Sequence, residues 1–189
     1  MKAIFIATLL ALCNFVYAQQ NTEFKEIKDY FDSQKSLLKT EFQKKYLAEN
    51  NPLKKDKIKA DYKDFVQKID SVKNVAYLGA LIRVKNTEDL KKVVHHPEVK
   101  MDNQEVEKPE FPNGINSLRE KVAELFYADG ICCDDKELNT TLKFVVEKDG
   151  SLSEISADGE IPAFNKQAEI ALYLLPDKFK PGTINGNTV

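Results

Sequence analysis

The dipeptide Asp149-Gly150 is the strongest constraint on what this chain can fold into. It separates two runs rich in strand-forming residues, 140–147 and 151–157. An Asp-Gly pair between such runs is typical of a tight turn, because glycine readily adopts the positive φ that the turn needs. Every second position of the first run is apolar and indicates one buried face, with Leu142, Phe144 and Val146. The sequence therefore predicts an antiparallel β-hairpin here.

Helical periodicity flanks this hairpin on both sides. Apolar residues spaced for one helix face precede it: Ile115, Leu118, Val122, Leu125 and Phe126. A second stripe follows it and stops before Pro176: Phe164, Ala168, Ala171, Leu172 and Leu175. Turn-forming dipeptides then occur in Lys180-Pro181-Gly182 and Asn185-Gly186. The predicted order is helix, hairpin, helix, turn.

This order resembles the C-terminal domain of TonB-family proteins over Glu110–Val189. The segments that carry the resemblance are Phe111-Pro112-Asn113-Gly114, the hairpin Phe144–Ser151, Phe164-Asn165-Lys166-Gln167-Ala168, Lys180-Pro181-Gly182 and Asn185-Gly186. The resemblance implies a small α+β domain of the bacterial periplasm, with a three-stranded antiparallel sheet and two helices on one face. It also implies that the domain pairs a sheet edge with a short strand of an outer-membrane receptor, which is β-augmentation.

The family pattern places its third strand after the position of Val189. If the natural protein ends there, we expect a two-stranded sheet with one open edge; if it continues, the third strand belongs to residues beyond the given sequence. The backbone pairing of Phe179–Val189 is therefore expected to be incomplete. An unpaired edge offers N–H and C=O groups to an incoming strand. On this reasoning we predict partner contacts at Phe179, Lys180, Thr183, Ile184 and Val189.

The first 18 residues have the pattern of a secretory signal peptide. A positive Met1-Lys2 start precedes an almost wholly apolar stretch, and cleavage is expected after Ala18. A helix over residues 3–18 would be about 24 Å long, shorter than the roughly 30 Å hydrocarbon core of a membrane. We predict an exported, periplasmic protein without an integral span after cleavage. The other possibility is that the segment stays as a membrane anchor.

Residues 19–95 are predicted to form an α-helical domain. Two apolar stripes of helical spacing lie on either side of Asn50-Asn51-Pro52, which predicts an antiparallel helical hairpin. Val75–Val84 is mostly apolar and fits a helix extension or a buried strand; no turn signal precedes it, so we favour the helix. Thr87 is predicted to be the N-cap of a restarted helix. Residues 96–110 follow as a short linker with few prolines, and residues 111–189 form the TonB-like domain.

Charge is divided unevenly along the chain. Residues 19–96 hold 17 basic and 12 acidic residues, whereas residues 97–189 hold 10 basic and 18 acidic ones. The basic residues are spread along the predicted helices and do not cluster with aromatic residues. We therefore interpret them as a solvated helix face, not as a nucleic-acid surface.

Cysteine and histidine supply no recognisable metal or catalytic pattern. Cys132 and Cys133 are adjacent, so they form a strained vicinal disulfide, free thiols or an intermolecular bridge; loop cysteines without chemistry are favoured. His95-His96 fits no metal-ligand spacing, and Asp134-Asp135 with Glu137 provides too few ligands for calcium. We expect no metal site and no cofactor.

The sequence contains no nucleophile motif and no phosphate-binding glycine loop. We predict a non-enzymatic periplasmic module that binds a strand of an outer-membrane receptor or another envelope protein. Two further hypotheses stay open. One is a membrane-anchored energy transducer for TonB-dependent transport, and the other is a structural protein that assembles with copies of itself. The fold expected is α+β: an N-terminal α-helical hairpin followed by a small TonB-like domain.

Overall fold

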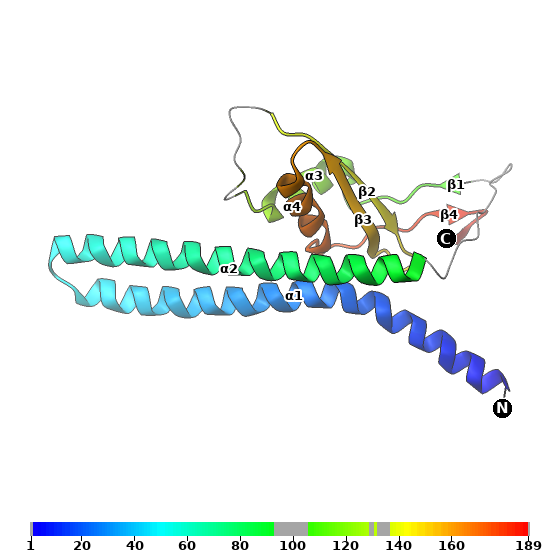
Figure 1. Cartoon of the computed structure of the whole chain (residues 1–189), viewed down its shortest axis with the longest axis horizontal. Helices are drawn as coiled ribbons and strands as arrows, with labels where there is room; N and C mark the ends of the chain where they lie inside the picture. Colours follow the sequence, from blue (N-terminus) through cyan, green and yellow to red (C-terminus); the bar gives the residue numbers. More distant parts are fainter. Residues whose placement is uncertain (1, 93–105, 129–130, 132–136, 189) are drawn as a thin grey trace. The chain divides into compact units, whose positions relative to one another are not determined.

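The computed structural model describes residues 2–92, 106–128, 131 and 137–188, and of these the side chains of all but residues 2–21, 91 and 92 (Figure 1). It is an α+β protein with its long helices first, as predicted. Its elements are α1 (Lys2–Ala48), α2 (Pro52–Lys92), β1 (Val106–Glu107), α3 (Gly114–Leu125), β2 (Thr140–Val146), β3 (Leu152–Gly159), α4 (Pro162–Tyr173), β4 (Thr183–Ile184) and β5 (Asn187–Thr188).

The chain divides into two compact units. Residues 22–80 form one, called here the helical unit, and Met1–Asn21 with Leu81–Val189 form the other, called the mixed unit. The last turns of α2 therefore belong to the mixed unit. Within the described residues, no helix is both long enough and apolar enough to span a bilayer.

Two antiparallel helices build the helical unit, as the Asn-Asn-Pro signal predicted. The apolar stripes of α1 and α2 face each other, so that Phe42 stacks on Tyr62 with ring centroids 4.3 Å apart. Farther along, Phe24 stacks on Tyr77 at 6.0 Å. Aromatic rings in contact bury apolar surface and also attract each other. These ring pairs therefore favour one register between α1 and α2.

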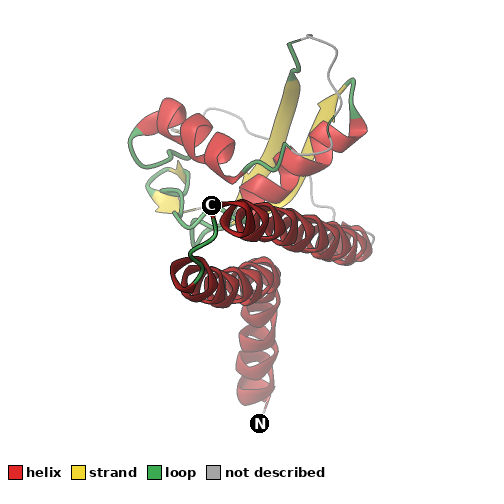
Figure 2. Ribbon diagram, turned by 90° about the vertical axis from the view of Figure 1, so that its left-hand side faces the viewer, coloured by secondary structure: helices red, strands yellow, loops and turns green. Residues whose placement is uncertain are grey.

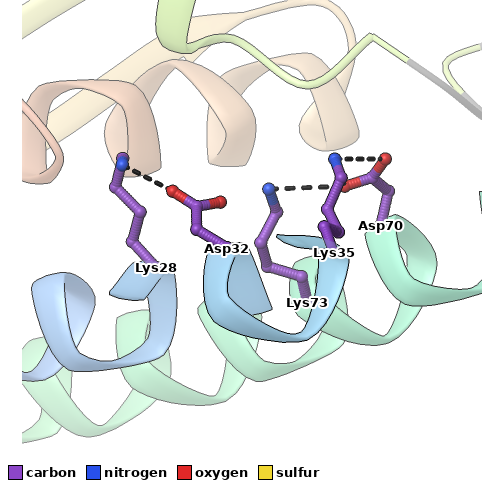
Figure 3. Close-up of polar contacts among 5 residues, drawn as sticks. All are labelled: Lys28, Asp32, Lys35, Asp70 and Lys73. Atoms are coloured by element: carbon purple, nitrogen blue, oxygen red, sulfur yellow. Dashed lines mark hydrogen bonds and ion pairs between the residues drawn. The ribbon is translucent and has the colours of Figure 1, made fainter. Parts of the chain in front are cut away.

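Of the polar contacts drawn in Figure 3, the pair Lys35–Asp70 joins the two helices at this register, and the others lie within one helix. Lys35 of α1 donates to both carboxylate oxygens of Asp70 in α2, at 2.8 and 3.0 Å. Lys73 of α2 lies 3.3 Å from the same carboxylate. In α1, Lys28 pairs at 2.7 Å with Asp32, which lies one turn before Lys35. Because Lys35 and Asp70 are only partly exposed, this pair is less screened by solvent than the other surface pairs.

Helix α2 runs without a break from Pro52 to Lys92, which confirms the helical interpretation of Val75–Val84. The prediction of a helix start at Thr87 is wrong. Its hydroxyl donates to the carbonyl of Arg83, four residues earlier in the same helix, at 2.9 Å. A threonine can satisfy its hydroxyl in this way inside a helix, so its presence there did not require a new N-terminus.

The hairpin predicted around Asp149-Gly150 is β2–β3, seen side by side in Figure 1. Burial alternates along β2 as expected, with Leu142, Phe144 and Val146 half-buried and Val145 exposed. The register contains one irregularity: Phe144 of β2 lies opposite both Glu154 and Ile155 of β3. Glu154 there has a φ of 49°, so this position is a β-bulge.

The helices on either side of the hairpin also form where the stripes predicted them. α4 begins with Pro162 at its first turn and packs against both β3 and β2, and α3 packs against α4 (Figures 1 and 2). Ile155 of β3 and Leu172 of α4 are among the most buried side chains of the described residues. The core of the mixed unit therefore lies between the sheet and α4.

A second, separate sheet differs from the single three-stranded sheet that the resemblance implied. Its strand order is β1-β4-β5, and all of its pairs are antiparallel (Figure 2). β4 and β5 are joined by Asn185-Gly186, with φ of 50° and 77°, which is the geometry of a two-residue hairpin turn. β1 was not predicted, because Val106-Glu107 lies in what the sequence indicated was linker.

The β2–β3 turn is held against the segment that follows α4. The Phe179 backbone N–H donates to the Gly150 carbonyl at 2.9 Å, and the Lys178 ammonium lies 2.7 Å from the Asp149 carboxylate. Partial burial acts to raise the pKa of Asp149, but hydrogen bonds from Lys178 and Ser151 outweigh it and lower the pKa from 3.8 to about 2. The turn therefore depends on an ionised Asp149.

We predict that Gly150→Ala destabilises the chain far more than Gly114→Ala. Both glycines have φ near 80°, so both substitutions cost roughly 1–2 kcal/mol of backbone strain. At Gly150 the new Cβ would also lie 2.1 Å from the Phe179 carbonyl oxygen, whereas nothing lies within 4 Å at Gly114. Urea unfolding measures both variants, and equal losses would contradict this account of the turn.

Asp149→Asn is expected to lower stability near neutral pH and to lose its effect in acid. A folded-state pKa below the ordinary one gives stability that is present above about pH 4 and disappears as the pH falls toward 2. Because the pair with Lys178 is exposed, the loss should be only about 0.2–1 kcal/mol. Urea unfolding of parent and variant across this pH range checks it; a difference independent of pH would refute it.

Candidate partner-binding edge

Two glutamates close the outer edge of β3, the edge that faces away from β2. The backbone N–H of Ala157 donates to the Glu169 carboxylate of α4 at 2.8 Å. The N–H of Glu154, at the bulge, donates to the Glu88 carboxylate of α2 at 2.9 Å. Because these amides already have acceptors, an added strand would have to displace both carboxylates to pair along β3.

Glu88 is the centre of a buried polar cluster. Glu88 is only 5% exposed. Its carboxylate also accepts a hydrogen bond from the Tyr173 hydroxyl at 3.0 Å. Burial raises the pKa of Tyr173, and the nearby Glu88 carboxylate raises it further. A buried carboxylate is tolerated only when donors surround it, so this cluster ties α2, β3 and α4 together.

Glu169 has a similar role one turn from Tyr173. Its carboxylate lies 3.3 Å from the Lys85 ammonium of α2 and accepts from Ala157. The helices that cover the core thus supply the acceptors for the β3 edge.

β2 has a neighbouring strand on one side only among the described residues. The Glu147 N–H donates to the Ser151 carbonyl at 2.8 Å, so residue 147 points its backbone toward β3. In an antiparallel ladder the backbone direction alternates along the strand. The N–H and C=O groups of Leu142, Phe144 and Val146 therefore point away from β3. Ala157, the partner of Leu142 in the register, also directs its N–H outward, which fits this assignment.

The two faces beside the β2 edge differ in chemistry. Leu142, Phe144 and Val146 lie on the half-buried face, whereas Lys143 and Val145 are exposed. A groove of about 440 Å³ runs past this exposed face and is lined by Lys85, Glu88, Asp89, Lys143, Phe144, Val145, Glu154, Ile155 and Ser156. A strand added at this edge would meet apolar side chains on one face and charged ones on the other.

The stretch from Phe179 that was predicted to bind a partner already contacts other segments of the same chain. Phe179 is 8% exposed, and its ring packs against Phe111 at 5.0 Å and Phe144 at 5.5 Å. Lys180 exchanges backbone hydrogen bonds with Glu110 at 2.8 and 3.0 Å. This position therefore joins two segments of the same domain.

Thr183 and Ile184 form β4, which has β1 on one side and β5 on the other. Their pairing is complete, so the reason for choosing this stretch, an open backbone edge, does not hold for them. Val189 lies outside the described residues. A partner contact at these positions stays a prediction, and the open edge of the β2–β3 sheet is at β2.

Several other residues of interest lie outside the described residues: His95, His96, Cys132, Cys133, Asp134 and Asp135. Glu137 is described and exposed. Within the described part of the chain, no group of three or more histidine, cysteine or acidic side chains is arranged to hold a metal ion.

Comparison of the chain with protein families, with curated proteins and with solved structures found no match. The geometry of the β2–β3 sheet is therefore the basis for a functional proposal.

Sequence reasoning missed Glu88 and Glu169, because neither stands in a motif. Glu88 directly follows Thr87, the expected N-cap of a restarted helix, so it was interpreted as an acid of that helix's first turn. Its partner amide at Glu154 is 66 residues away. The signal that could have indicated Glu169 is that it is the one charged residue in the segment 167–175, between Ala168 and Ile170.

We predict that Glu88→Ala lowers the free energy of unfolding by about 2–4 kcal/mol, because it removes the acceptor of one buried donor, the Tyr173 hydroxyl, and one partly buried donor, the Glu154 amide. Glu88→Gln should cost less, since both donors bond Oε1 of Glu88 and the amide oxygen of glutamine can still accept both, without the negative charge. The exposed neighbour offers a matched control, and Asp89→Ala should change stability by less than about 0.5 kcal/mol. Urea unfolding followed by circular dichroism measures all three; equal effects at Glu88 and Asp89 would rule out the buried cluster.

Proposed function

We propose that this chain is an exported, non-enzymatic protein-binding module that captures an extended strand of an envelope partner along the outer edge of β2. Residues 110–189 are proposed to be a TonB C-terminal-like domain, and the partner class that this implies is an outer-membrane receptor. Binding would add one strand to the β2–β3 sheet by backbone hydrogen bonds, with no cofactor.

The observation that carries this proposal is the difference between the two edges of one small sheet. On β3, Glu88 and Glu169 occupy outward amides. On β2, the outward groups of Leu142, Phe144 and Val146 have no strand beside them among the described residues. Natural sheets usually cover, charge or twist an edge that must not pair, so one covered and one open edge favours addition at β2.

The side chains along β2 support an alternating partner sequence. Residues of the added strand next to Leu142 and Phe144 would be apolar, because that face continues into the core. Residues on the other face would lie near Lys143 and favour an acidic or polar side chain. Main-chain pairing would supply the affinity, and this alternation would supply the selectivity.

Amide hydrogen exchange by NMR tests the proposal directly. In the free chain, the amides of Leu142, Phe144 and Val146 should exchange faster than those of Lys143 and Val145. Short peptides selected on the chain from a random library should slow the first set and raise the unfolding midpoint, since a ligand of the native state stabilises it by mass action.

Leu142→Pro should abolish protection by the selected peptide, because proline removes an outward N–H that the new ladder needs. Leu142→Ala is the matched control: it loses the same side chain but keeps the N–H, and should bind the peptide better than the proline variant. Thermal unfolding confirms that both variants fold. Peptides that protect β5 or α4 and leave β2 unchanged would refute the proposal.

Pairing of β2 with β2 of a second copy is the other outcome that this edge allows. Light scattering distinguishes it: a dimer that Leu142→Pro dissociates and Leu142→Ala keeps would mean that the edge serves self-assembly.

A further inference from the structure

The turn that joins α1 to α2 combines positive charge with exposed apolar surface. Residues 44–59, called here the hairpin tip, contain six lysines and two acidic residues. Leu47 and Leu53 stand on either side of the turn and are 78% and 80% exposed, more than any other large hydrophobic residue described. Moving two leucines this exposed out of water would be favourable, so they can contribute to binding by an apolar partner.

The turn itself is tightly held. The Glu49 carboxylate accepts the backbone N–H groups of Asn50 and Asn51, at 2.9 and 2.8 Å. The Asn51 side-chain oxygen accepts the N–H of Leu53 at 2.9 Å and so caps α2. The hydrogen bond from Asn51 lowers the pKa of Glu49, which keeps this carboxylate ionised and directed at the backbone. The tip therefore presents its leucines from a defined turn.

Lysines lie on both sides of the turn that carries these leucines. The ammonium groups of Lys55 and Lys59 lie over the Tyr46 ring, 5.0 and 5.3 Å from its centroid. The other lysines of the tip are exposed: Lys44, Lys45, Lys54 and Lys57. The structure thus places two lysines of α2 over an aromatic ring of α1, whereas in the linear sequence the basic residues do not cluster with aromatic ones.

We propose that the hairpin tip docks on the surface of an anionic lipid bilayer. The lysines would interact with lipid phosphates, and Leu47 and Leu53 would enter the boundary between headgroups and acyl chains. Polybasic segments bind anionic membranes electrostatically, and adjacent apolar side chains add to that binding by leaving water.

Charge and shape favour a membrane over the other partners of a basic surface. A second copy would bring one positively charged tip against another, which is repulsive. Single-stranded nucleic acid binds through aromatic rings that stack on bases, but the ring of Tyr46 is covered by Lys55 and Lys59. Neither partner would cover two exposed leucines as a bilayer does.

Co-sedimentation with lipid vesicles tests this proposal. The chain from Gln19 onward is used, since residues 3–18 are themselves apolar and this is the form that cleavage after Ala18 would leave. It should sediment with phosphatidylcholine vesicles that contain phosphatidylglycerol, more weakly as salt is raised, and not with phosphatidylcholine alone.

Two double variants separate the contributions of charge and apolar surface. Lys54→Gln with Lys57→Gln should lower vesicle affinity about tenfold or more, and Leu47→Ser with Leu53→Ser by a similar factor. The matched controls are Lys68→Gln and Leu37→Ser, which change exposed residues of the same helices outside the tip and should bind as the parent does. Circular dichroism checks that the helices are intact.

Three results would overturn the proposal. The first is no sedimentation with the anionic vesicles at low salt. The second is equal loss of affinity in the tip variants and in their controls. The third is that a fluorescent single-stranded DNA binds the parent, and not the lysine variant, while vesicles bind neither.

Discussion

The hydrogen bonds from the β3 backbone to Glu88 and Glu169 are what the arrangement of the mixed unit depends on. A carboxylate as buried as that of Glu88 is stable only with strong donors, and it has the Glu154 amide and the Tyr173 hydroxyl. Those donors come from a strand and a helix, so one side chain on α2 holds both in place. Removing it would disturb the bulge, the helix packing and the protected edge together.

The same bonds give the sheet its two unlike edges. The bulge turns the amide of Glu154 away from β2, and the carboxylates use the groups that would otherwise invite a strand along β3. β2 has no such cover among the described residues, and within the β2–β3 sheet this difference is what gives the proposed partner one edge at which to add. The hairpin tip, in contrast, offers side chains and no backbone, so the two proposed surfaces would recognise unlike partners.

Local patterns in the sequence predicted the elements well. The Asn-Asn-Pro signal located the end of α1 and the start of α2, and Asp149-Gly150 located the β2–β3 turn. These succeed because helix periodicity, strand alternation and turn residues depend on near neighbours. Thr87 failed because a hydroxyl that can cap a helix can equally donate to a carbonyl within one.

The candidate site depended on contacts that such patterns do not encode. Phe179 to Ile184 was chosen because the last strand of the family pattern was missing. In the structure, β1 and β5 pair with β4 on its two sides. The partner of Thr183 is Glu107, 76 residues earlier, in the segment 96–110 that was expected to be a linker. Glu88 likewise acts on an amide far along the chain. Residues that pair over such distances can be recognised only once the fold brings them together.

The pairing of β1 with β4 has a consequence for the order of folding. The β2–β3 hairpin closes a short loop and can form early, whereas Val106 must find Ile184 across most of the mixed unit. Closing so long a loop is entropically slow, and few backbone pairs reward it: two between β1 and β4, and the bridge between Glu110 and Lys180. This small sheet should therefore be the last part of the domain to assemble and the first to open, so that the C-terminal strands fray while the rest stays folded.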